Sequence, residues 1–451
     1  MKILITAAGS YGDVAPYTGV GARLQEAGHE VVLATHDTYA PLVRAAGLGF
    51  RRLPADPRTA RPADGAPEKS PSPGGNRALM RQAAAFIHQL GGGLAEATPQ
   101  DTELLLLSAT TAPLGRHLAE AMDIPCLDLP LVPNAPTGDF APVTSGGRSL
   151  GRWGNRTAGR LALRVVDRLY AGATRDLRAR LGLPPASPRT VRRRAEAADR
   201  PVLHGFSEVL VPRPADWRPG LDIVGNWWPW HAPDAQLPAQ VEDFLSAGPP
   251  PVFIGFGSMA SGEGERLSDL AVRALRRAKV RGILQSGWAN LSTQPHTQSP
   301  DSPHDSYNSP TSPTSPTSPI SPISPNFNDS DILTIGEVPH ALLYPRMSAV
   351  VHHCGAGTAA AGLRAGVPTV PVPVTADQPF WAARLASVGA ATAPIPFKAL
   401  ASEDAMPLLA EAIIRATIEP ALRRRAADAA HRLASEDGSG AVAKTVDRLS
   451  A

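Results

Sequence analysis

The sequence predicts an α/β protein with two domains, each built on a parallel β-sheet. Its 451 residues exceed the size at which one hydrophobic core usually stops growing. Short apolar runs alternate with helical segments in both halves, the order in which crossover helices join parallel strands. A proline- and tryptophan-rich segment, residues 225–251, separates the halves, as expected of a hinge between two rigid units.

The first half supplies four apolar runs of strand length and two helical segments. In chain order these are strand 2–7, helix 20–27, strand 29–34, strand 104–107, a helix from about Pro113, and strand 125–129. Gly28 lies between the first helix and the second strand, so the chain begins β-α-β. Residues 58–76 are rich in Pro, Gly, Ala and Ser, and we expect a mobile loop over a surface cleft.

Arginine recurs at every fourth position from residue 152 to residue 168, with apolar residues between. On a helix, steps of four residues overshoot one turn by about 40°, so these arginines form a stripe that winds slowly around the surface. Two interpretations stay open. We favour a solvated helix face; the alternative is a surface that attracts anionic lipid or an acidic partner.

The second half repeats the alternation of strands and helices. Its strand candidates are residues 251–258, 282–285, 332–334, 349–353 and 368–372, and they predict a second parallel sheet. Residues 293–330 interrupt it with a Ser-Pro-Thr repeat that has too few apolar residues to bury a core, so we expect disorder. We interpret this insert as a tolerated spacer, with phosphorylation of its Ser/Thr-Pro sites as the alternative.

Composition excludes several classes of protein. Lys plus Arg number 44 against 41 Asp plus Glu, an excess too small to indicate a nucleic-acid-binding face. Cys126 and Cys354 cannot form a disulfide framework or a four-ligand zinc site, which fits a reducing cytoplasm. The N-terminus enters a strand without the features of a secretory leader. No apolar run of about 18 residues predicts a membrane span, although peripheral membrane contact stays open.

The first candidate site is the turn at residues 9–16, between the first strand and the first helix. Gly9 and Gly12 let backbone amides approach a ligand, and the helix start carries partial positive charge. The dinucleotide pattern Gly-x-Gly-x-x-Gly is absent, which disfavours an oxidoreductase. Asp13 places one carboxylate at the carboxyl end of a strand, where open α/β sheets bind ligands. A role as a helix cap is the equal alternative.

The second candidate site is the turn at residues 352–358, His-His-Cys-Gly-Ala-Gly-Thr. Adjacent strand residues point to opposite faces, so the two histidines are not expected to form a zinc pair. Gly355 and Gly357 expose amides and Thr358 adds a hydroxyl, which together suit a phosphate or diphosphate. We expect Cys354 to pack rather than to act as a nucleophile.

These motifs belong to a longer pattern that resembles the UDP-glycosyltransferase superfamily, and within it the sterol and antibiotic glycosyltransferases. The resemblance lies in residues 10–16, 207–217, 338–340 and, most specifically, 352–378. It covers most of the chain outside the two low-complexity segments. It implies the GT-B fold, in which two Rossmann-like domains face each other across a cleft, the first holding mainly the acceptor and the second mainly the sugar nucleotide.

The domain boundaries follow from this resemblance. Residues 1–225 are expected to form the N-terminal acceptor-binding domain, 226–250 the linker, and 251–432 the nucleotide-sugar domain. Residues 433–451 are expected to form a C-terminal helix that packs back on the N-terminal domain. Residues 130–140 and the arginine-striped helix, together with the loop at 58–76, are expected to shape the acceptor pocket.

The resemblance also implies roles for individual residues. Asp13 falls where many relatives have the catalytic base, and His353 and Thr358 match positions that hold the donor diphosphate. The other implied donor contacts are Gly355, Gly357 and Ser258 with the diphosphate, Asp377 and Gln378 with the sugar hydroxyls, and Val338 and Trp288 with the nucleobase.

The chain departs from plant relatives of this superfamily at three places. Glu337 stands where they stack the nucleobase on a tryptophan, which is why Trp288 is considered as a substitute. Ala361 stands where they bind ribose with a glutamate. They also orient a histidine base with an acid near Ser108 and Ala109, where this chain has none. Asp13 would therefore act alone, which a carboxylate can do because it has no tautomer to fix.

The implied reaction is a single displacement by an inverting hexosyltransferase. Asp13 removes a proton from an acceptor hydroxyl that attacks the anomeric carbon, while His353, Thr358 and a helix N-terminus stabilise the leaving diphosphate. No metal and no cofactor are expected. Other glycosyltransferases bind a divalent ion with an Asp-x-Asp pair, but the Asp-Ser-Asp sequence at residues 329–331 is interpreted as part of a turn. The donor is expected to be a UDP- or dTDP-hexose, and the acceptor a sterol, polyketide or antibiotic aglycone.

Two other functions stay open at this stage. A catalytically silent GT-B protein that binds nucleotide or activates a partner would suit the missing ribose and dyad acids. An NAD(P)-dependent oxidoreductase would need an acid at the end of the second strand, where the chain reads Thr35-His36-Asp37. Donor turnover supports the transferase over the silent protein, and a change in cofactor absorbance would indicate the oxidoreductase.

Overall fold

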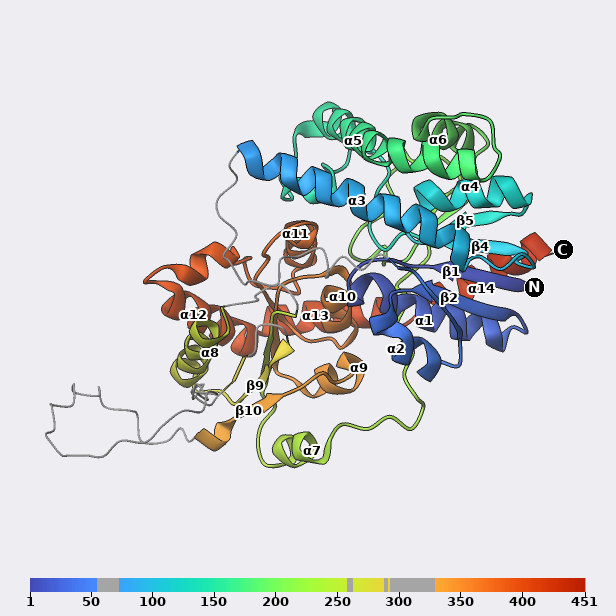
Figure 1. Cartoon of the computed structure of the whole chain (residues 1–451). Helices are drawn as coiled ribbons and strands as arrows, with labels where there is room; N and C mark the ends of the chain where they lie inside the picture. The colour runs from blue at the N-terminus through green and yellow to red at the C-terminus, as the bar shows by residue number, and fades with distance from the viewer. Residues whose placement is uncertain (55–72, 258–262, 288–290, 293–328, 451) are drawn as a thin grey trace, which may run out of the picture.

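The computed structural model describes residues 1–54, 73–257, 263–287, 291–292 and 329–450 (Figure 1). These residues form two α/β domains, each around a parallel sheet, which confirms the predicted fold class. The predicted loop at 58–76 and spacer at 293–330 lie mostly outside the described residues. The exceptions are residues 73–76, which belong to a helix rather than to a loop, and residues 329–330, which begin a short 3-10 turn.

The first sheet has seven strands in the order β3-β2-β1-β4-β5-β6-β7. Its strands are β1 (Lys2–Thr6), β2 (Glu30–Thr35), β3 (Gly49–Arg52), β4 (Leu104–Leu107), β5 (Cys126–Asp128), β6 (Val202–His204) and β7 (Leu221–Ile223). Its helices are α1 (Tyr11–Glu26), α2 (Ala40–Ala45), α3 (Pro73–Ala97), α4 (Ala112–Met122), α5 (Gly151–Arg180) and α6 (Pro188–Ala197). The strand order reverses between β1 and β4, which are neighbours in the sheet, and such switch points are where open α/β sheets bind ligands.

The second sheet has five strands in the order β10-β9-β8-β11-β12 and reverses between β8 and β11. Its strands are β8 (Val252–Gly255), β9 (Gly282–Gln285), β10 (Ile332–Ile335), β11 (Ala349–His352) and β12 (Thr369–Pro371). Its helices are α7 (Ala239–Ser246), α8 (Gly264–Ala278), α9 (His340–Leu343), α10 (Ala356–Arg364), α11 (Gln378–Val388), α12 (Ala405–Ile418) and α13 (Pro420–Leu433).

The central strands are apolar on both faces, as parallel sheets covered by helices require. All four leucines of β4 are fully buried, and Leu4 of β1 pairs in register with Val32 of β2 and Leu105 of β4. Packing of α1 on one face and of α3 and α4 on the other fills the two halves of this core. The carboxyl ends of β1 and β4 are thereby held beside each other.

The segment between the sheets is more ordered than the linker predicted at 226–250. Its residues Ala239–Ser246 form α7, whose Val241 and Leu245 pack on the second sheet. Trp227 is buried in the first domain against Tyr17, with ring centroids 5.7 Å apart. The next residue, Trp228, lies under the guanidinium of Arg364 at the end of α10. The tryptophans therefore join the first domain to a helix of the second.

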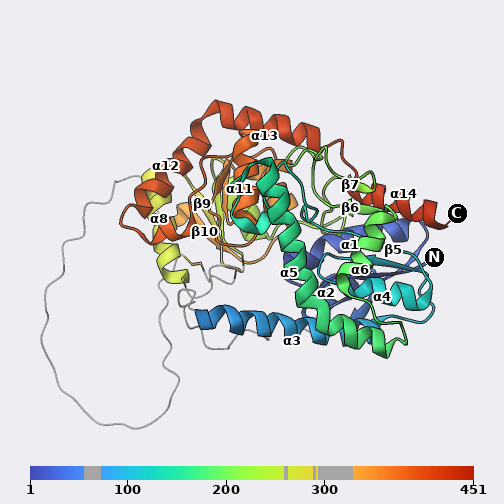
Figure 2. The ribbon, with the colours of Figure 1, turned by 90° about the horizontal axis from the view of Figure 1, so that it is seen from above.

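The chain crosses back to the first domain at its C-terminal end. Helix α14 (Gly438–Ser450) packs against α1, and its Val442, Ala443 and Val446 belong to the core of the first sheet. Figure 2 shows α13 leading into α14 beside the N-terminal strand, with the two chain ends close together. Ser207 donates a hydrogen bond to Glu436 at 2.6 Å just before this helix.

Among the described residues, three histidines have no exposed surface, and their burial predicts a pH-dependent stability. Burial lowers the pKa of His117 and of His204 to about 4, and that of His352 well below its usual value. Between about pH 6.5 and pH 4 the unfolded chain binds protons that the folded chain does not, so the free energy of unfolding falls as the pH falls. Each histidine contributes a slope of up to about 1.4 kcal/mol per pH unit.

Urea denaturation at intervals from pH 7 to pH 5 measures this slope. The exposed His231 provides the control, because His231→Gln should leave the slope unchanged. A free energy of unfolding that stays constant over this range would contradict the prediction.

Candidate active site

Asp13 lies in the first turn of α1, directly after β1. Ser10 caps this helix, and its backbone amide and hydroxyl donate hydrogen bonds to Oδ2 of Asp13 at 2.7 and 2.8 Å. A Cβ at Gly9 would lie 2.5 Å from the same oxygen, so only glycine leaves room for the carboxylate. The Oδ1 atom accepts no hydrogen bond from any described residue. Asp13 therefore takes part in the helix cap through Oδ2 and keeps Oδ1 available.

The imidazole of His353 is held between two glycine turns at the switch point of the second sheet. A Cβ at Gly257, after β8, would lie 2.9 Å from its Cε1, and a Cβ at Gly355 would lie 2.9 Å from its Nε2. Gly257 also has a φ of +57°, a conformation that favours glycine. The two glycines thus fix the ring at the carboxyl ends of β8 and β11.

His353 is neutral at physiological pH and has an unused nitrogen. Burial lowers its pKa to about 4, and its buried Nδ1 has no hydrogen-bond partner in the described residues. Helix α10 begins beside it with Gly355 as N-cap and Gly357 and Thr358 in the first turn. The amides at a helix N-terminus have no partner within the helix. The turn therefore presents several hydrogen-bond donors and no acid, as a phosphate site does.

Asp377 and Gln378 lie at the start of α11, the helix after β12. The indole of Trp381 donates a 2.7 Å hydrogen bond to Oδ2 of Asp377. Gln378 is 5% exposed, and its Oε1 accepts hydrogen bonds from the amides of Val374 and Thr375 at 2.8 and 3.1 Å. Both side chains are therefore positioned by protein contacts, and the Gln378 oxygen is already engaged.

Asp13 and Asp377 belong to different domains but interact electrostatically. Burial raises the pKa of Asp377, the hydrogen bond from Trp381 opposes that rise, and the charge of Asp13 adds to it. Helix α1 contacts α10 directly. Tyr11, at the start of α1, also interacts with Glu337 of the second domain. Burial raises the pKa of Tyr11, and the negative charge of Glu337 raises it further. The ends of β1 and β11 thus face each other across the domain boundary.

A second contact closes this boundary next to α11. Phe140 of the first domain packs on Phe380, with ring centroids 5.3 Å apart, and the guanidinium of Arg384 lies over both rings at 5.1 and 5.0 Å. The loop at Gly147 also approaches the carbonyl oxygen of Pro379. These contacts hold the loop after β5 against the helix that begins with Gln378.

Of the remaining candidate residues, some lie within the described part of the chain and others lie outside it. Val338 is partly buried against the core under α9 and leads into that helix. Ala361 packs against the same core. Ser258 and Trp288 lie outside the described residues, next to Gly257 and Gly287, whose backbones approach each other. Five of the candidate residues, Asp13, His353, Gly355, Gly357 and Thr358, lie on α1 and the α10 turn that meet at the domain boundary.

The positioning contacts of three side chains at the site were not predicted from the sequence. Ser10 was recognisable as a cap with an acid three residues later, the spacing of a capping box. Trp381 lies four residues after Asp377 and so on the same helix face. Phe140 gave no local signal, because its partner Phe380 comes from the other domain.

An apolar pocket of about 320 Å³ opens at the carboxyl ends of β4 and β5, beside β1. Its walls come from α4, α5, α6 and the loop after β5, and include Ala109, Phe140, Ala162 and Tyr170. Residues of the segment 130–140 and of the arginine-striped helix α5 both line this pocket. The size is at the lower end of the range for small-molecule sites.

Three observations concern the other expectations. Gly9 of the β1–α1 turn donates a backbone hydrogen bond to His36, so this amide is already engaged, and Asp37 forms an ion pair with Arg52. Within the described ranges, no cluster of three or more His, Cys, Asp or Glu side chains is arranged to hold a metal ion. None of the helices there combines the length and apolar composition needed to cross a bilayer.

Two family models match the chain. The glycosyltransferase family 28 N-terminal domain matches residues 3–98, and the erythromycin biosynthesis protein CIII-like C-terminal domain matches residues 326–449. Both matches are consistent with the division into two parallel-sheet domains, one at each end of the chain.

Curated relatives and solved structures agree with these models. The chain is 32% identical to the O-mycaminosyltylonolide 6-deoxyallosyltransferase of Streptomyces fradiae, over 97% of this chain and 95% of that protein. It is also 32% identical to a sterol 3-beta-glucosyltransferase of Arabidopsis thaliana, over 93% of this chain but only 62% of that protein. The crystal structure of the glycosyltransferase of kitacinnamycin shares the fold, with a TM-score of 0.66 at 18% identity, covering 99% and 98% of the two chains. Neither the silent protein nor the oxidoreductase gains support.

Proposed function

The chain belongs to the UDP-glycosyltransferase superfamily, and we propose that it moves a hexose from a nucleotide sugar to a hydroxyl of a lipophilic acceptor. The observation that supports this most strongly is the contact of α1, which carries Asp13, with α10 across the domain boundary, next to the electrostatic interaction of Asp13 with Asp377. Helices α1 and α10 follow the strands at the switch points of the two sheets. The names of two relatives, a sterol 3-beta-glucosyltransferase and an O-mycaminosyltylonolide 6-deoxyallosyltransferase, support a lipophilic acceptor.

In this proposal Asp13 is the general base. Ser10 holds one carboxylate oxygen through two hydrogen bonds, so the other is oriented toward an incoming hydroxyl. The acceptor oxygen loses its proton to Asp13 and forms a bond to the anomeric carbon. The bond from that carbon to the diphosphate oxygen breaks on the opposite face, and the sugar configuration inverts.

The α10 turn stabilises the diphosphate as it leaves. The Nδ1 of His353, which has no partner in the described residues, and the free amides of the first turn of α10 are the proposed donors, and Thr358 adds a hydroxyl. The helix N-terminus contributes a favourable partial charge where negative charge develops. These groups supply electrostatic stabilisation without a metal ion.

Asp377 and Gln378 are proposed to bind the hydroxyls of the donor sugar. The pair begins α11 directly beside the domain boundary, and the amide nitrogen of Gln378 is the group left to donate, since its oxygen binds the preceding loop. The backbone at Val338, with Ser258 and Trp288, is proposed to complete the nucleotide site. The base is proposed to be uracil or thymine.

The apolar pocket beside β4 and β5 is the proposed acceptor site. Ala162→Phe would extend a ring into it from α5, so we expect the KM for the acceptor to rise about tenfold, as loss of roughly 1.4 kcal/mol of binding would give. Hydrolysis of the donor by water should be unaffected. Thr157→Phe, on an exposed position of the same helix, is the control. An unchanged acceptor KM in Ala162→Phe would place the acceptor elsewhere.

A panel of nucleotide sugars and lipophilic alcohols, read by mass spectrometry, tests the proposed function. Transfer or slow hydrolysis of a UDP- or dTDP-hexose is the expected result. Tight nucleotide binding with no turnover of any donor would favour a catalytically silent protein instead.

A further inference from the structure

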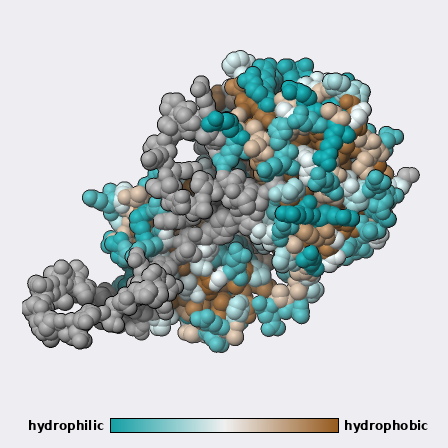
Figure 3. Space-filling view, viewed as in Figure 1, coloured by the Kyte–Doolittle hydropathy of each residue, from teal (hydrophilic) through white to brown (hydrophobic). Residues whose placement is uncertain are grey.

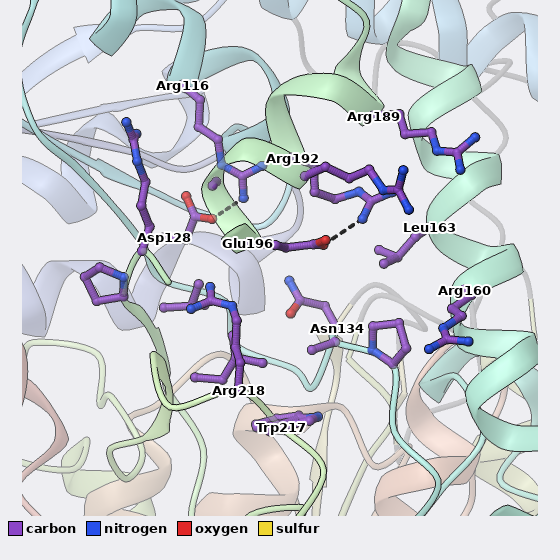
Figure 4. Close-up of a pocket in the computed structure, with 18 of the residues that line it drawn as sticks. Arg116, Asp128, Asn134, Arg160, Leu163, Arg189, Arg192, Glu196, Trp217 and Arg218 are labelled. Atoms are coloured by element: carbon purple, nitrogen blue, oxygen red, sulfur yellow. Dashed lines mark hydrogen bonds and ion pairs between the residues drawn. The ribbon is translucent and has the colours of Figure 1, made fainter. Parts of the chain in front are cut away.

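A second and larger pocket, of about 660 Å³, lies on the first domain beside the apolar one (Figure 4). It is formed by the ends of β5 and β6 and by helices α5 and α6. Eight arginines line it against three acidic residues. Figure 4 shows Arg160 and Leu163 on one side and Arg116 and Asp128 on the other.

The three acidic residues of this pocket are already neutralised. Asp128 pairs with Arg116, and Glu196 pairs with Arg192 at 2.6 Å. Asp216 pairs with Arg156 from outside the pocket and accepts hydrogen bonds from Thr137 and the Gly138 amide. The pocket therefore keeps a large excess of positive charge that its own acids do not balance.

Five of the arginines have no acidic partner in the described part of the chain. They are Arg160 and Arg164 of α5, Arg189 and Arg193 of α6, and Arg200. The alternative to a binding role is that these arginines only belong to solvent-exposed helix faces. On such faces arginines point outward in all directions. Here arginines of two helices converge on one cavity, whereas Arg168 and Arg175 of α5 and Arg194 of α6 do not line it. In Figure 3 the surface over α5 and α6 mixes hydrophilic and apolar side chains.

The larger, arginine-lined pocket, here called the cationic pocket, shares part of its wall with the apolar pocket. Arg116, Asp128, Asn134, Leu163 and Arg192 are among the side chains that line both. One end of the combined site is thus apolar and lies at the end of β4, the strand next to β1 in the sheet, and the other end carries unpaired guanidinium groups. Guanidinium groups bind carboxylates and phosphates by charge-assisted hydrogen bonds.

We propose that the acceptor is an anionic amphiphile, whose apolar body lies in the apolar pocket and whose carboxylate or phosphate lies among the arginines of α5 and α6. This inference rests on the proposed function, because it names the class of acceptor. Neutral alcohols fill only the apolar part of such a site. An anionic group at the far end adds binding energy and fixes which hydroxyl faces Asp13.

Binding of cis-parinaric acid, a fluorescent long-chain carboxylic acid, and of its methyl ester tests the inference without any sugar nucleotide. The full chain should bind the acid at least tenfold more tightly than the ester. Arg160→Gln/Arg164→Gln/Arg193→Gln should remove that preference and leave ester binding unchanged. Arg168→Gln/Arg175→Gln/Arg194→Gln, which changes the same charge on the same two helices outside the pocket, should retain it.

Three outcomes would overturn the inference. The first is equal affinity of the wild type for the acid and the ester. The second is an equal loss of acid binding in both triple variants, which would attribute the effect to net charge. The third is loss of binding to phosphatidylglycerol vesicles in the pocket variant with unchanged parinarate binding, which would assign the arginines to a membrane surface. If donor turnover persists in any of these cases, the proposed function stands and only the acceptor class fails.

Discussion

Asp13→Asn is expected to lower the rate of glycosyl transfer by about 10²- to 10⁴-fold, the usual contribution of a general base. The amide keeps an oxygen that can accept the two hydrogen bonds from Ser10, so α1 should remain capped and the fold intact. It cannot accept the proton of an acceptor hydroxyl. Nucleotide affinity should be nearly unchanged, because the proposed diphosphate site lies on the other domain.

Single-turnover transfer and equilibrium nucleotide binding, measured on the same preparation, separate these effects. Asp37→Asn is the matched control, because Asp37 follows the neighbouring strand β2 but pairs with Arg52. Its transfer rate should equal that of the wild type. Wild-type transfer by Asp13→Asn would remove Asp13 from the mechanism.

His353→Ala is expected to weaken donor binding by about 10- to 100-fold. The variant loses one hydrogen bond to a charged diphosphate, an interaction of about 1.5–3 kcal/mol. Because burial lowers the pKa of His353 to about 4, the free enzyme presents a neutral imidazole. The free imidazole therefore stays neutral between pH 6 and pH 8, and we expect donor affinity to be constant over this range.

Isothermal titration with UDP and with dTDP measures the loss. His353→Asn, which keeps a side-chain donor, should recover part of the affinity. His231→Ala, at an exposed position of the interdomain segment, should have none of these effects. Donor affinity that is unchanged in His353→Ala would exclude the imidazole from the diphosphate site.

Much of the fold was predictable from local patterns. Short apolar runs identified β1, β2, β4, β8 and β11, which lie in the inner part of the two sheets. Strands β3, β6 and β7 were not predicted. β3 reads Gly-Phe-Arg-Arg and β7 has Asp222 between apolar neighbours, so neither is an apolar run, and the Val-Leu-His of β6 was not recognised as a strand. Their pairing depends on tertiary contacts that no short sequence window contains.

The two turns of the site were predictable for the same reason, since each lies on a contiguous strand-turn-helix segment. Their approach to each other was implied only by family resemblance, because Asp13 and His353 are far apart in the chain. The cationic pocket was not predictable. The arginine stripe of α5 was visible, but Arg189 and Arg193 of α6 were needed to make it a cavity.

The central claim is that a glycosyl diphosphate held by the α10 turn faces the carboxylate of Asp13. A crystal structure of Asp13→Asn with bound UDP-glucose or dTDP-glucose tests it most directly, because the slow variant preserves the donor. We predict diphosphate oxygens within hydrogen-bond distance of His353, Thr358 and the amide of Gly357, with the anomeric carbon toward residue 13. A diphosphate bound at the β1–α1 turn, or a sugar directed away from residue 13, would contradict the account.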